Sequence, residues 1–478
     1  MTRISIDPIS RVEGHGKITL QQNERLEITE ARLHIVEFRG FEKFIQGRPY
    51  QEVPVLVQRL CGICPVSHHL AAAKATDMLL GVKQLSPTAD KMRRLMHFGQ
   101  VLQSHALHFF HLSSPDLLFG YDDEVRHRNI IGVIQDHPEL AKQGVLLRKY
   151  GQEVIRLTSG KRIHGTGAIP GGINKFLSAD ERDYLQRDSA QIIAWAQSAV
   201  ELFKTIFYQH QTYHQQFASI SSHMMSLVQP NGALELYDGG LRVRKADNTL
   251  AYDHYDPAHY LQLIGEHIEP WSYMKFPFLK ALGVADGWYR VGPLARINNC
   301  NFIDTPLAEE QRQQFKALNN GLPVQFTLAY HWARLIELLH CAESIATLLQ
   351  DPDLLQGDLT VQGEMQSVGI GVIEAPRGTL MHHYEIDADG LITRANLIVS
   401  TTHNNRAMNE SIRQVASRYL SGNTITEPLL NQLEVAVRAY DPCLSCATHA
   451  LGKMPLEVTL LDQHGEVLDR RLKSTVDG

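Results

Sequence analysis

Four cysteines form two pairs with the spacing of metal ligands, one pair near each end of the chain. Cys61 and Cys64 lie in Arg-Leu-Cys-Gly-Ile-Cys-Pro, and Cys443 and Cys446 lie in Asp-Pro-Cys-Leu-Ser-Cys. Each pair can place two thiolates on one metal, so together they could hold zinc, nickel or iron. The spacing alone leaves a structural zinc site, a redox disulfide and a catalytic transition-metal centre open. The long separation of the pairs argues against a compact zinc ribbon.

Further motifs accompany the cysteines in a fixed order along the chain. They are Arg11-Val12-Glu13-Gly14-His15, Phe38-Arg39-Gly40-Phe41-Glu42, Pro170-Gly171-Gly172 and Glu374-Ala375-Pro376-Arg377-Gly378. A histidine also follows each cysteine pair, His68 after the first and His449 after the second. From about residue 4 to the C-terminus, this set resembles the signature of the large subunits of nickel-iron hydrogenases.

The resemblance implies a nickel-iron centre. In this family four cysteines bind nickel, which predicts Cys61, Cys64, Cys443 and Cys446 as the nickel ligands. Cys64 and Cys446 would also bridge to iron, which carries one carbon monoxide and two cyanides. Thiolates suit such electron-rich metals because both partners are soft. The implied reaction is the reversible heterolytic cleavage of H2.

The same resemblance gives roles to residues around the metals. Cys443 is the expected base, and Glu13 is the expected carboxylate that relays the proton outward. Arg377 is expected, with Pro376, over the open face of the metals, where its guanidinium would stabilise anionic ligands. The other expected supporting residues are His68 as a donor to the Cys64 sulfur, Asp116 as the partner of the arginine, and Thr401 as a donor to a cyanide. The alternative is that Glu13 pairs with a surface arginine and the others are ordinary core polar residues.

A second, oxygen-rich cation site is also implied. Glu42, the carbonyl of Leu397 and His449 match the magnesium ligands of relatives, and water would complete an octahedral shell around Mg2+. Three further histidines, His105, His108 and His111, recur every three residues. We expect those three to pack in the core, because the four sulfurs already explain the metal motif.

Two sequence differences from exported, membrane-linked relatives favour the cytoplasmic, bidirectional, NAD-coupled group. They are Thr401-Thr402-His403-Asn404-Asn405, without a tryptophan after the threonines, and His164-Gly165, without a proline. The implied partners are a diaphorase and an iron-sulfur small subunit, with the iron-sulfur clusters, flavin and NAD on those partners only. Nickel chaperones and a maturation endopeptidase are also implied. NADP or a deazaflavin as acceptor, a nickel-free subunit of the respiratory complex I type and a structural zinc protein are the alternatives.

The composition of the chain agrees with a globular enzyme. Of 478 residues, 44% are hydrophobic and 21% are charged, and the net charge of −6 provides no general attraction to nucleic acid. No run approaches the roughly 20 apolar residues of a membrane span, and the first residues lack a signal-peptide core. Six cysteines are too few for a disulfide scaffold. These features predict a cytoplasmic protein without a membrane span.

Helices flanked by strands are expected to position the predicted ligands. Partial alternation predicts strands at 17–22 and 26–37, and a hairpin at 379–386 and 391–400 around Asp-Ala-Asp-Gly. Apolar residues at three-to-four spacing predict helices at 71–80, 91–112, 180–217 and 324–350. The predicted fold class is therefore mainly α with small antiparallel β-sheets at both ends (α+β), built as a large helical bundle.

One domain is expected over residues 1–449. It comprises a β-rich part at 1–40, a helical bundle at about 50–350, the hairpin at 379–400 and the ligand segment at 436–449. Residues 450–478 are predicted to be a maturation tail that an endopeptidase removes between His449 and Ala450, since mature relatives end at that histidine. The alternative is that 456–461 and 466–468 form a permanent hairpin.

Overall fold

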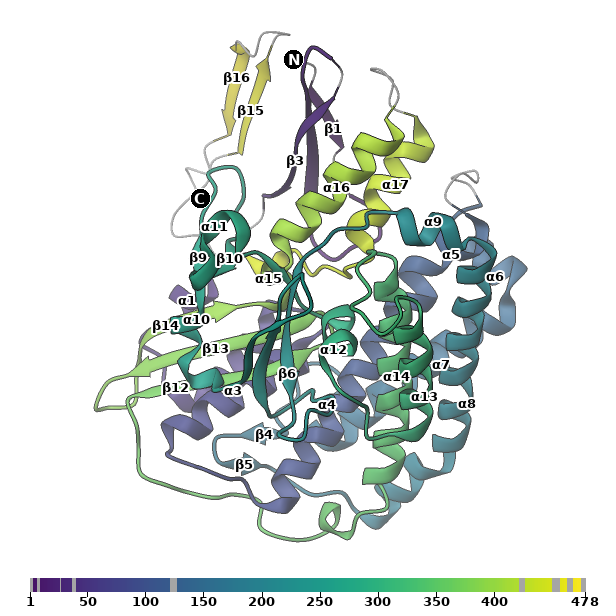
Figure 1. Cartoon of the computed structure of the whole chain (residues 1–478). Coiled ribbons are helices and arrows are strands. Elements are labelled where there is room, and N and C mark those ends of the chain that lie inside the picture. The colour runs from purple at the N-terminus through teal and green to yellow at the C-terminus, as the bar shows by residue number, and fades with distance from the viewer. Residues whose placement is uncertain are drawn as a thin grey trace.

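Long helices build one side of the molecule (Figure 1). They are α4 (Pro87–Leu107), α7 (Pro138–Ser159), α8 (Ala179–Gln209), α13 (Pro306–Ala317) and α14 (Ala329–Leu348). Helix α4 packs against α7 and α14, and α14 also packs against α8 and α13. Most of α14 is buried, whereas α8 buries one side only. The computed structural model describes residues 3–6, 9–25, 27–36, 40–120, 127–420, 426–448, 456–461 and 467–473.

Local sequence signals explain where these helices begin and how closely they pack. The hydroxyl of Ser86 accepts a backbone hydrogen bond at the start of α4, and Ser178 and Glu181 form a reciprocal capping box at the start of α8. Helices α4 and α7 cross where Gly99 and Gly151 meet. A Cβ atom on Gly151 would lie 2.6 Å from the carbonyl oxygen of Gly99. Only glycine permits this approach.

The predicted sheets near both ends of the chain are confirmed, and each has one strand more than expected. The N-terminal sheet has the order β1-β2-β3, and the second has the order β12-β13-β14; both are antiparallel. Their strands are β1 (Arg3–Ile6), β2 (Gly16–Gln22), β3 (Ile28–Ile35), β12 (Val368–Ala375), β13 (Gly378–Ile386) and β14 (Ile392–Ile398).

Strands that were not predicted interrupt the helical bundle expected over about 50–350. A four-stranded sheet of order β11-β6-β7-β8 lies there, with β6 (His223–Val228), β7 (Gly240–Arg244), β8 (Leu250–Tyr255) and β11 (Tyr289–Arg290). A separate hairpin pairs β9 (Ile264–His267) with β10 (Phe276–Leu279). These strands are short, and buried strands such as β6 and β10 do not alternate between apolar and polar residues. The periodicity of the sequence therefore does not reveal them.

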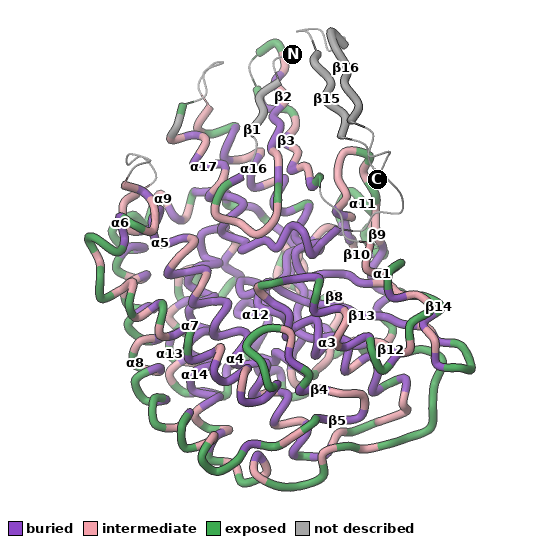
Figure 2. Tube along the Cα trace, turned by 180° about the vertical axis from the view of Figure 1, so that it is seen from behind, coloured by how far each residue is buried: buried purple, intermediate pink, exposed green. Residues whose placement is uncertain are grey.

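Two regions carry the cysteines to the interior. Helix α3 (Pro65–Leu79) packs on β12 and β13 and begins directly after Cys64. The C-terminal region contains α15 (Ser400–His403), α16 (Asn405–Tyr419) and α17 (Glu427–Arg438), and the segment after α17 is buried as far as Thr448. Figure 2 shows buried backbone around α3, α4 and α12, with exposed backbone along the rim.

Shorter elements connect these parts. They are α1 (Phe41–Phe44), α2 (Val53–Leu56), a π-helical turn (His108–Ser113), α5 (Ser114–Phe119), α6 (Ile130–Asp136), β4 (Ala168–Ile169), β5 (Gly172–Ile173), α9 (Gln211–Gln216), α10 (Tyr260–Leu263), α11 (Gly283–Asp286) and α12 (Pro293–Asn299). Beyond the predicted cleavage site, β15 (Leu456–Leu461) pairs with β16 (Val467–Lys473) in an antiparallel hairpin. No helix in the described part of the chain has the length and apolarity that a membrane crossing requires.

Candidate metal centre

The two cysteine pairs, predicted to share one site, lie together in the interior. The four sulfur atoms all lie within 4.8 Å of one another, and every one of these cysteines is buried. The Cys443 sulfur is 3.2 Å from that of Cys61 and 2.7 Å from that of Cys446. All four are free cysteines in this structure.

Backbone groups orient the first cysteine pair. The Cys61 sulfur accepts hydrogen bonds from the backbone N–H groups of Ile63 and Cys64, each at 3.3 Å. Cys64 occupies the position before the first residue of α3, and Pro65 suits the first turn of that helix because it has no N–H to satisfy. The backbone at the start of α3 therefore holds Cys64 directly and holds the Cys61 sulfur through these two hydrogen bonds.

The segment that contains Glu13 lies against the second cysteine pair. The backbone N–H of Leu444 donates a hydrogen bond of 2.9 Å to the Glu13 carbonyl, and Glu13 and Cys443 form a parallel bridge. Gly14 has a φ of +82°, and a Cβ there would lie 2.6 Å from the backbone nitrogen of Ser445. The glycine of this motif is therefore required for the close approach of the two chain ends.

The carboxylate of Glu13 reaches the cysteine cluster directly. Its Oε2 accepts hydrogen bonds from the Cys443 thiol at 3.0 Å and from the Ser445 backbone N–H at 3.2 Å. The Ser445 hydroxyl donates to Oε1 of the same carboxylate. Glu13 therefore binds the ligand segment, and the alternative of a surface salt bridge is wrong.

Arg377 is buried beside the cysteines and pairs with Asp441. Its Nε donates to the Asp441 carbonyl at 2.5 Å, and its Nη2 donates to the Asp441 carboxylate at 3.1 Å. Burial alone would lower the pKa of Arg377, but the charges of Asp441, Cys443 and Cys64 raise it well above its usual value. Its Nη1 has no hydrogen-bond partner among the described residues. One donor group thus remains for an anionic ligand.

A small cavity lies beside the sulfurs, between α3, β13 and α15. The residues that line it are Cys64, Ser67, His68, Ala375, Pro376, Arg377, Leu380, Val399, Ser400, Thr401 and Cys443. Residues that four separate motifs predicted for the metal site thus line the same cavity. The Thr401 oxygen accepts the backbone N–H of Cys443 at 2.9 Å, so the hydroxyl proton of Thr401 can point elsewhere.

The thiols strongly influence each other's ionisation. Hydrogen bonds from Cys443, Cys446 and Cys61 lower the pKa of Cys64 well below its usual value, and a smaller effect of the same kind comes from His68. Burial raises the pKa values of Cys443 and Cys446 well above theirs. Cys64 and Arg377 line the same cavity.

The expected pairing of Asp116 with Arg377 is wrong. The Asp116 carboxylate instead pairs with Arg11 at 2.6 Å and with Arg438 at 2.5 Å. The motif could not reveal this, because Asp116 lies on α5 and contacts Arg11 of the N-terminal segment. Asp441, in contrast, belongs to the segment that carries Cys443. The Asp-Pro that precedes Cys443 was the available signal for the true partner of Arg377.

His68 is buried, and its Nδ1 lies 3.2 Å from Nε2 of His382, whose own Nδ1 lies 2.5 Å from the Tyr384 hydroxyl. The sequence predicted His68 but neither of these two partners. The expected core role of the three spaced histidines is confirmed for His105 and His108, which are buried and bonded to protein groups.

Two of the three expected magnesium ligands lie together. Oε1 of Glu42 accepts the backbone N–H of Leu397 at 2.8 Å, which brings α1 against β14. His449, the third expected ligand, and Ala450 lie outside the described residues, as do Phe38 and Arg39 of the second motif. The magnesium site therefore stays a prediction.

These groups fit a thiolate-bound metal centre. Four sulfurs converge at a distance that one ion or a pair of ions can bridge, and soft ligands of this kind select metals such as nickel and iron. The free Nη1 of Arg377 and the adjoining cavity suit small anionic ligands on one of the metals. The fold and the site thus define a metalloenzyme in which two distant cysteine pairs share one centre.

Comparison with known proteins identifies the class. A family model described as nickel-dependent hydrogenase matches residues 39–119 and 233–449, and one described as HoxL-like matches residues 3–38. The chain is 46% identical to the NAD-reducing hydrogenase HoxS subunit beta of Cupriavidus necator, over 98% of this chain and 99% of that one. It is 41% identical to one subunit of the F420-non-reducing hydrogenase of Methanothermobacter thermautotrophicus, over 98% of this chain and 100% of that one.

Solved structures agree with this assignment. A crystal structure of an NAD+-reducing [NiFe]-hydrogenase in the H2-reduced state superposes with a TM-score of 0.92 and 58% identity, covering 94% of this chain and all of that one. A Ni-Fe-Se hydrogenase from Desulfovibrio vulgaris Hildenborough shares the fold, with a TM-score of 0.76 and 22% identity. The chain belongs to the large-subunit family of nickel-dependent hydrogenases. This membership decides against the nickel-free and zinc alternatives.

Proposed function

We propose that the chain is the catalytic large subunit of an NAD-reducing nickel-iron hydrogenase, which cleaves H2 reversibly and heterolytically. The observation that carries this proposal is the group of four buried sulfurs within 4.8 Å, with Glu13 in contact with Cys443 and Arg377 at the cavity beside Cys64. The coupling to NAD is supported by the two NAD-reducing relatives, at 46% and 58% identity.

Cys61, Cys64, Cys443 and Cys446 would hold the nickel, with Cys64 and Cys446 also bound to the iron. When bound, such a centre supplies the redox chemistry at which H2 is split. The small cavity next to Cys64 would receive the one carbon monoxide and two cyanides that the iron carries. Arg377 would donate from Nη1 to one cyanide, and the Thr401 hydroxyl would donate to the other, while Pro376 keeps the cavity wall apolar.

The proton has a short exit through this chain's own residues. Cys443 accepts it at Sγ, and Glu13 takes it at Oε2, 3.0 Å away. This distance is within hydrogen-bond reach, as a general acid/base requires. The two donors from Ser445 keep the carboxylate facing Cys443. His68 would hold the orientation of the Cys64 sulfur through its contact with His382.

A magnesium ion would bind near the C-terminus, through Glu42, the Leu397 carbonyl and His449. The contact between Glu42 and the Leu397 backbone supports the first part of this assignment, because it places a carboxylate and the β14 backbone side by side. Carboxylate and carbonyl oxygens are ligands that Mg2+ accepts, and water would complete its octahedral shell.

The proposed assembly is a cytoplasmic heteromultimer. An iron-sulfur small subunit would carry electrons away from the buried cysteines, and a flavin-containing diaphorase would pass them to NAD+. Nickel chaperones and a maturation endopeptidase would act before assembly. The name of the Cupriavidus necator relative, one part of an NAD-reducing hydrogenase, supports the diaphorase partner.

Purification of the chain with its natural partners tests the proposal. We expect nickel and iron in equal amounts, infrared bands of bound carbon monoxide and cyanide, and H2-dependent reduction of NAD+. A preparation that contains zinc alone would contradict the metal centre. A metal-loaded complex that reduces another acceptor but not NAD+ would contradict only the NAD coupling.

A further inference from the structure

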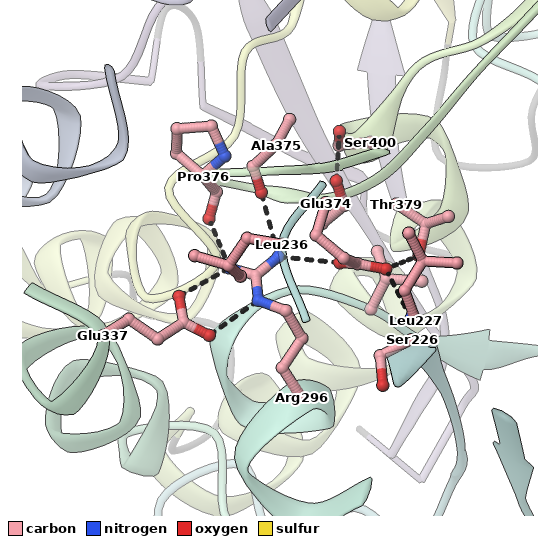
Figure 3. Close-up of polar contacts among 12 residues, drawn as sticks. Ser226, Leu227, Leu236, Arg296, Glu337, Glu374, Ala375, Pro376, Thr379 and Ser400 are labelled. Carbon is pink, nitrogen blue, oxygen red and sulfur yellow. Dashed lines mark hydrogen bonds and ion pairs between the residues drawn. The ribbon is translucent and has the colours of Figure 1, made fainter. Parts of the chain in front are cut away.

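A group of fully buried charges lies behind the segment that carries Arg377. Arg296 on α12, Glu337 on α14 and Glu374 at the end of β12 each have 0% side-chain exposure. Figure 3 shows Arg296 between the two carboxylates, with its guanidinium facing the Glu374–Pro376 backbone. None of these three residues lines the cavity beside the sulfurs. A charge that is so completely removed from water is costly unless it is paired and hydrogen-bonded.

Every donor of the Arg296 guanidinium is directed to a partner. Its Nε and Nη2 each donate to one carboxylate oxygen of Glu337 at 2.6 Å, which is the bidentate geometry of a strong arginine-carboxylate pair. Its Nη1 donates to Glu374 at 2.8 Å. Glu374 is held in turn by the backbone N–H of Leu227 at 3.0 Å and the Thr379 hydroxyl at 2.7 Å. The guanidinium therefore has a single orientation.

The same guanidinium donates hydrogen bonds to the two backbone carbonyls immediately before Arg377. Its Nη1 donates to the Ala375 carbonyl at 2.9 Å, and its Nη2 donates to the Pro376 carbonyl at 3.2 Å. Two consecutive peptide groups are thus fixed by one planar side chain. Because the next residue is Arg377, these two hydrogen bonds set the direction in which the Arg377 side chain enters the cavity.

Buried charges alternate in sign from this clamp to the metal site. In order they are Glu374, Arg296, Glu337, Arg334, Asp441 and Arg377. Burial lowers the pKa of Arg334 to about 10, against the raising effect of the charges of Asp441 and Glu337. Burial would raise the pKa of Glu337, yet Arg296 holds it at about 2. Arg334 interacts electrostatically with both Glu337 and Asp441 and is therefore the cation between the Arg296–Glu337 pair and the Asp441–Arg377 pair.

We propose that Arg296 is a positioning residue that aims Arg377 at the anionic ligands of the metal centre, by clamping the Ala375 and Pro376 carbonyls while Glu337 holds its guanidinium in place. The role of the ligands in this statement rests on the proposed function. The clamp itself rests on contacts among this chain's own residues. Lysine cannot replace Arg296 here, because an ammonium group lacks the planar fork that reaches both carboxylates and both carbonyls.

A double-mutant cycle on the purified complex tests the proposal. We expect Arg296→Lys to lower kcat about tenfold or more, since small displacements of a positioned group cost factors of up to about a hundred. In an Arg377→Lys background the same substitution should cost less than about twofold, because the group that it positions is already gone. The infrared cyanide bands should shift in Arg296→Lys in the same direction as in Arg377→Lys. Equal losses in both backgrounds, or unshifted bands, would overturn the proposal.

Arg93→Lys is the matched control. Arg93 is equally buried, pairs bidentately with Asp77, and also holds two carbonyls, those of Ile169 and Gly172, but it does not touch residues 374–377. Arg93→Lys should lower the unfolding temperature as much as Arg296→Lys does, but it should leave the cyanide bands unchanged. If Arg296→Lys fails to fold, Glu337→Gln replaces it in the cycle, with the same expected coupling to Arg377.

A crystal structure of Arg296→Lys, or of Glu337→Gln, decides the proposal without any metal. Displacement of the Arg377 guanidinium from Asp441 supports it, and an unmoved Arg377 overturns it. A wild-type complex that lacks nickel and iron would contradict the proposed function, while this structural comparison would still decide the role of Arg296.

Discussion

The Cys443 thiol donates a hydrogen bond to the Glu13 carboxylate across 3.0 Å, although 430 positions separate the two residues. The contact depends on Gly14, whose missing side chain lets the N-terminal segment lie against Ser445. This contact supports the proposed roles of Cys443 as the base and Glu13 as the relay. The geometry predicts that the proton leaves the site through Glu13.

Replacement of Glu13 by glutamine tests this relay. The amide keeps the shape and hydrogen bonding of the carboxylate but cannot carry the proton, so turnover and H/D exchange should fall by about 10² to 10⁴. The infrared bands of the metal centre should persist. Glu30→Gln, on the exposed side of β3, is the control and should retain full activity. Near-normal H/D exchange in a metal-loaded Glu13→Gln enzyme would rule the relay out.

Serine at Cys64 or Cys446 should abolish assembly of the metal centre. Both sulfurs belong to the four-sulfur group, and both are predicted to bridge the two metals, for which the harder oxygen is a poor ligand. Nickel and iron analysis of the purified variants measures the effect. Cys300→Ser is the control, since Cys300 is buried outside the group and should leave the metal content unchanged. Full nickel and iron in either ligand variant would contradict its bridging role.

Sequence motifs predicted that Cys61, Cys443 and Glu13 would lie together, because these residues belong to short patterns with a fixed chemical purpose, but the motifs missed Asp441 as the partner of Arg377. They could not predict Arg296 or Glu337, which lie in ordinary helical sequence and meet the site only through packing. The sequence also did not predict the central sheet. Its strands are too short for their periodicity to stand out, and their pairing is decided by neighbours that are distant in sequence.

Asp116 was assigned to Arg377 from the motif, and its actual pairing leads to a different prediction. Asp116→Asn removes the charge that Arg11 and Arg438 share, and it leaves Arg438 buried without this partner. Loss of one member of a buried pair costs about 3 to 5 kcal/mol, so the unfolding temperature of the enzyme should fall clearly. The cyanide bands should not shift, since Arg377 keeps Asp441. A band shift without loss of stability would contradict this assignment. Asp238→Asn is the control, because its pair with Lys74 is exposed and contributes little.

Acidification should destabilise the chain below about pH 6.5. Burial lowers the pKa values of five histidines to about 4: His69, His97, His105, His214 and His340. The unfolded chain, with histidine pKa values near 6.5, binds protons more readily, so stability is fully present above that pH and falls towards pH 4. Each histidine contributes up to about 3 kcal/mol to this loss.

Denaturant unfolding from pH 8 to pH 5 measures the effect. His340→Gln should make the pH dependence shallower, because one proton fewer is taken up on unfolding, while at pH 8 the substitution has no titration effect to remove. An identical pH dependence in wild type and His340→Gln would show that His340 does not contribute.

Residues 450–478 are predicted to be removed after nickel insertion. The nickel-dependent hydrogenase match ends at residue 449. Thr448 is already buried at 4% exposure beside the cysteines, while the chain goes on to the β15–β16 hairpin. That hairpin matches the alternative of a permanent structure, so strand pairing alone does not decide between the two.

In this structure, which includes the β15–β16 hairpin of the tail, the four sulfurs already lie within 4.8 Å of one another, so the tail does not keep the two cysteine pairs apart. Cleavage after His449 would instead free the new C-terminus, whose imidazole would then bind at the predicted magnesium site, so that processing and metal binding are linked. Intact-mass measurement decides the question. Active, nickel-loaded enzyme should end at His449, whereas protein made without nickel, and Cys446→Ser protein made with it, should both keep the tail. Active enzyme that still ends at Gly478 would show that the hairpin is a permanent part of the protein.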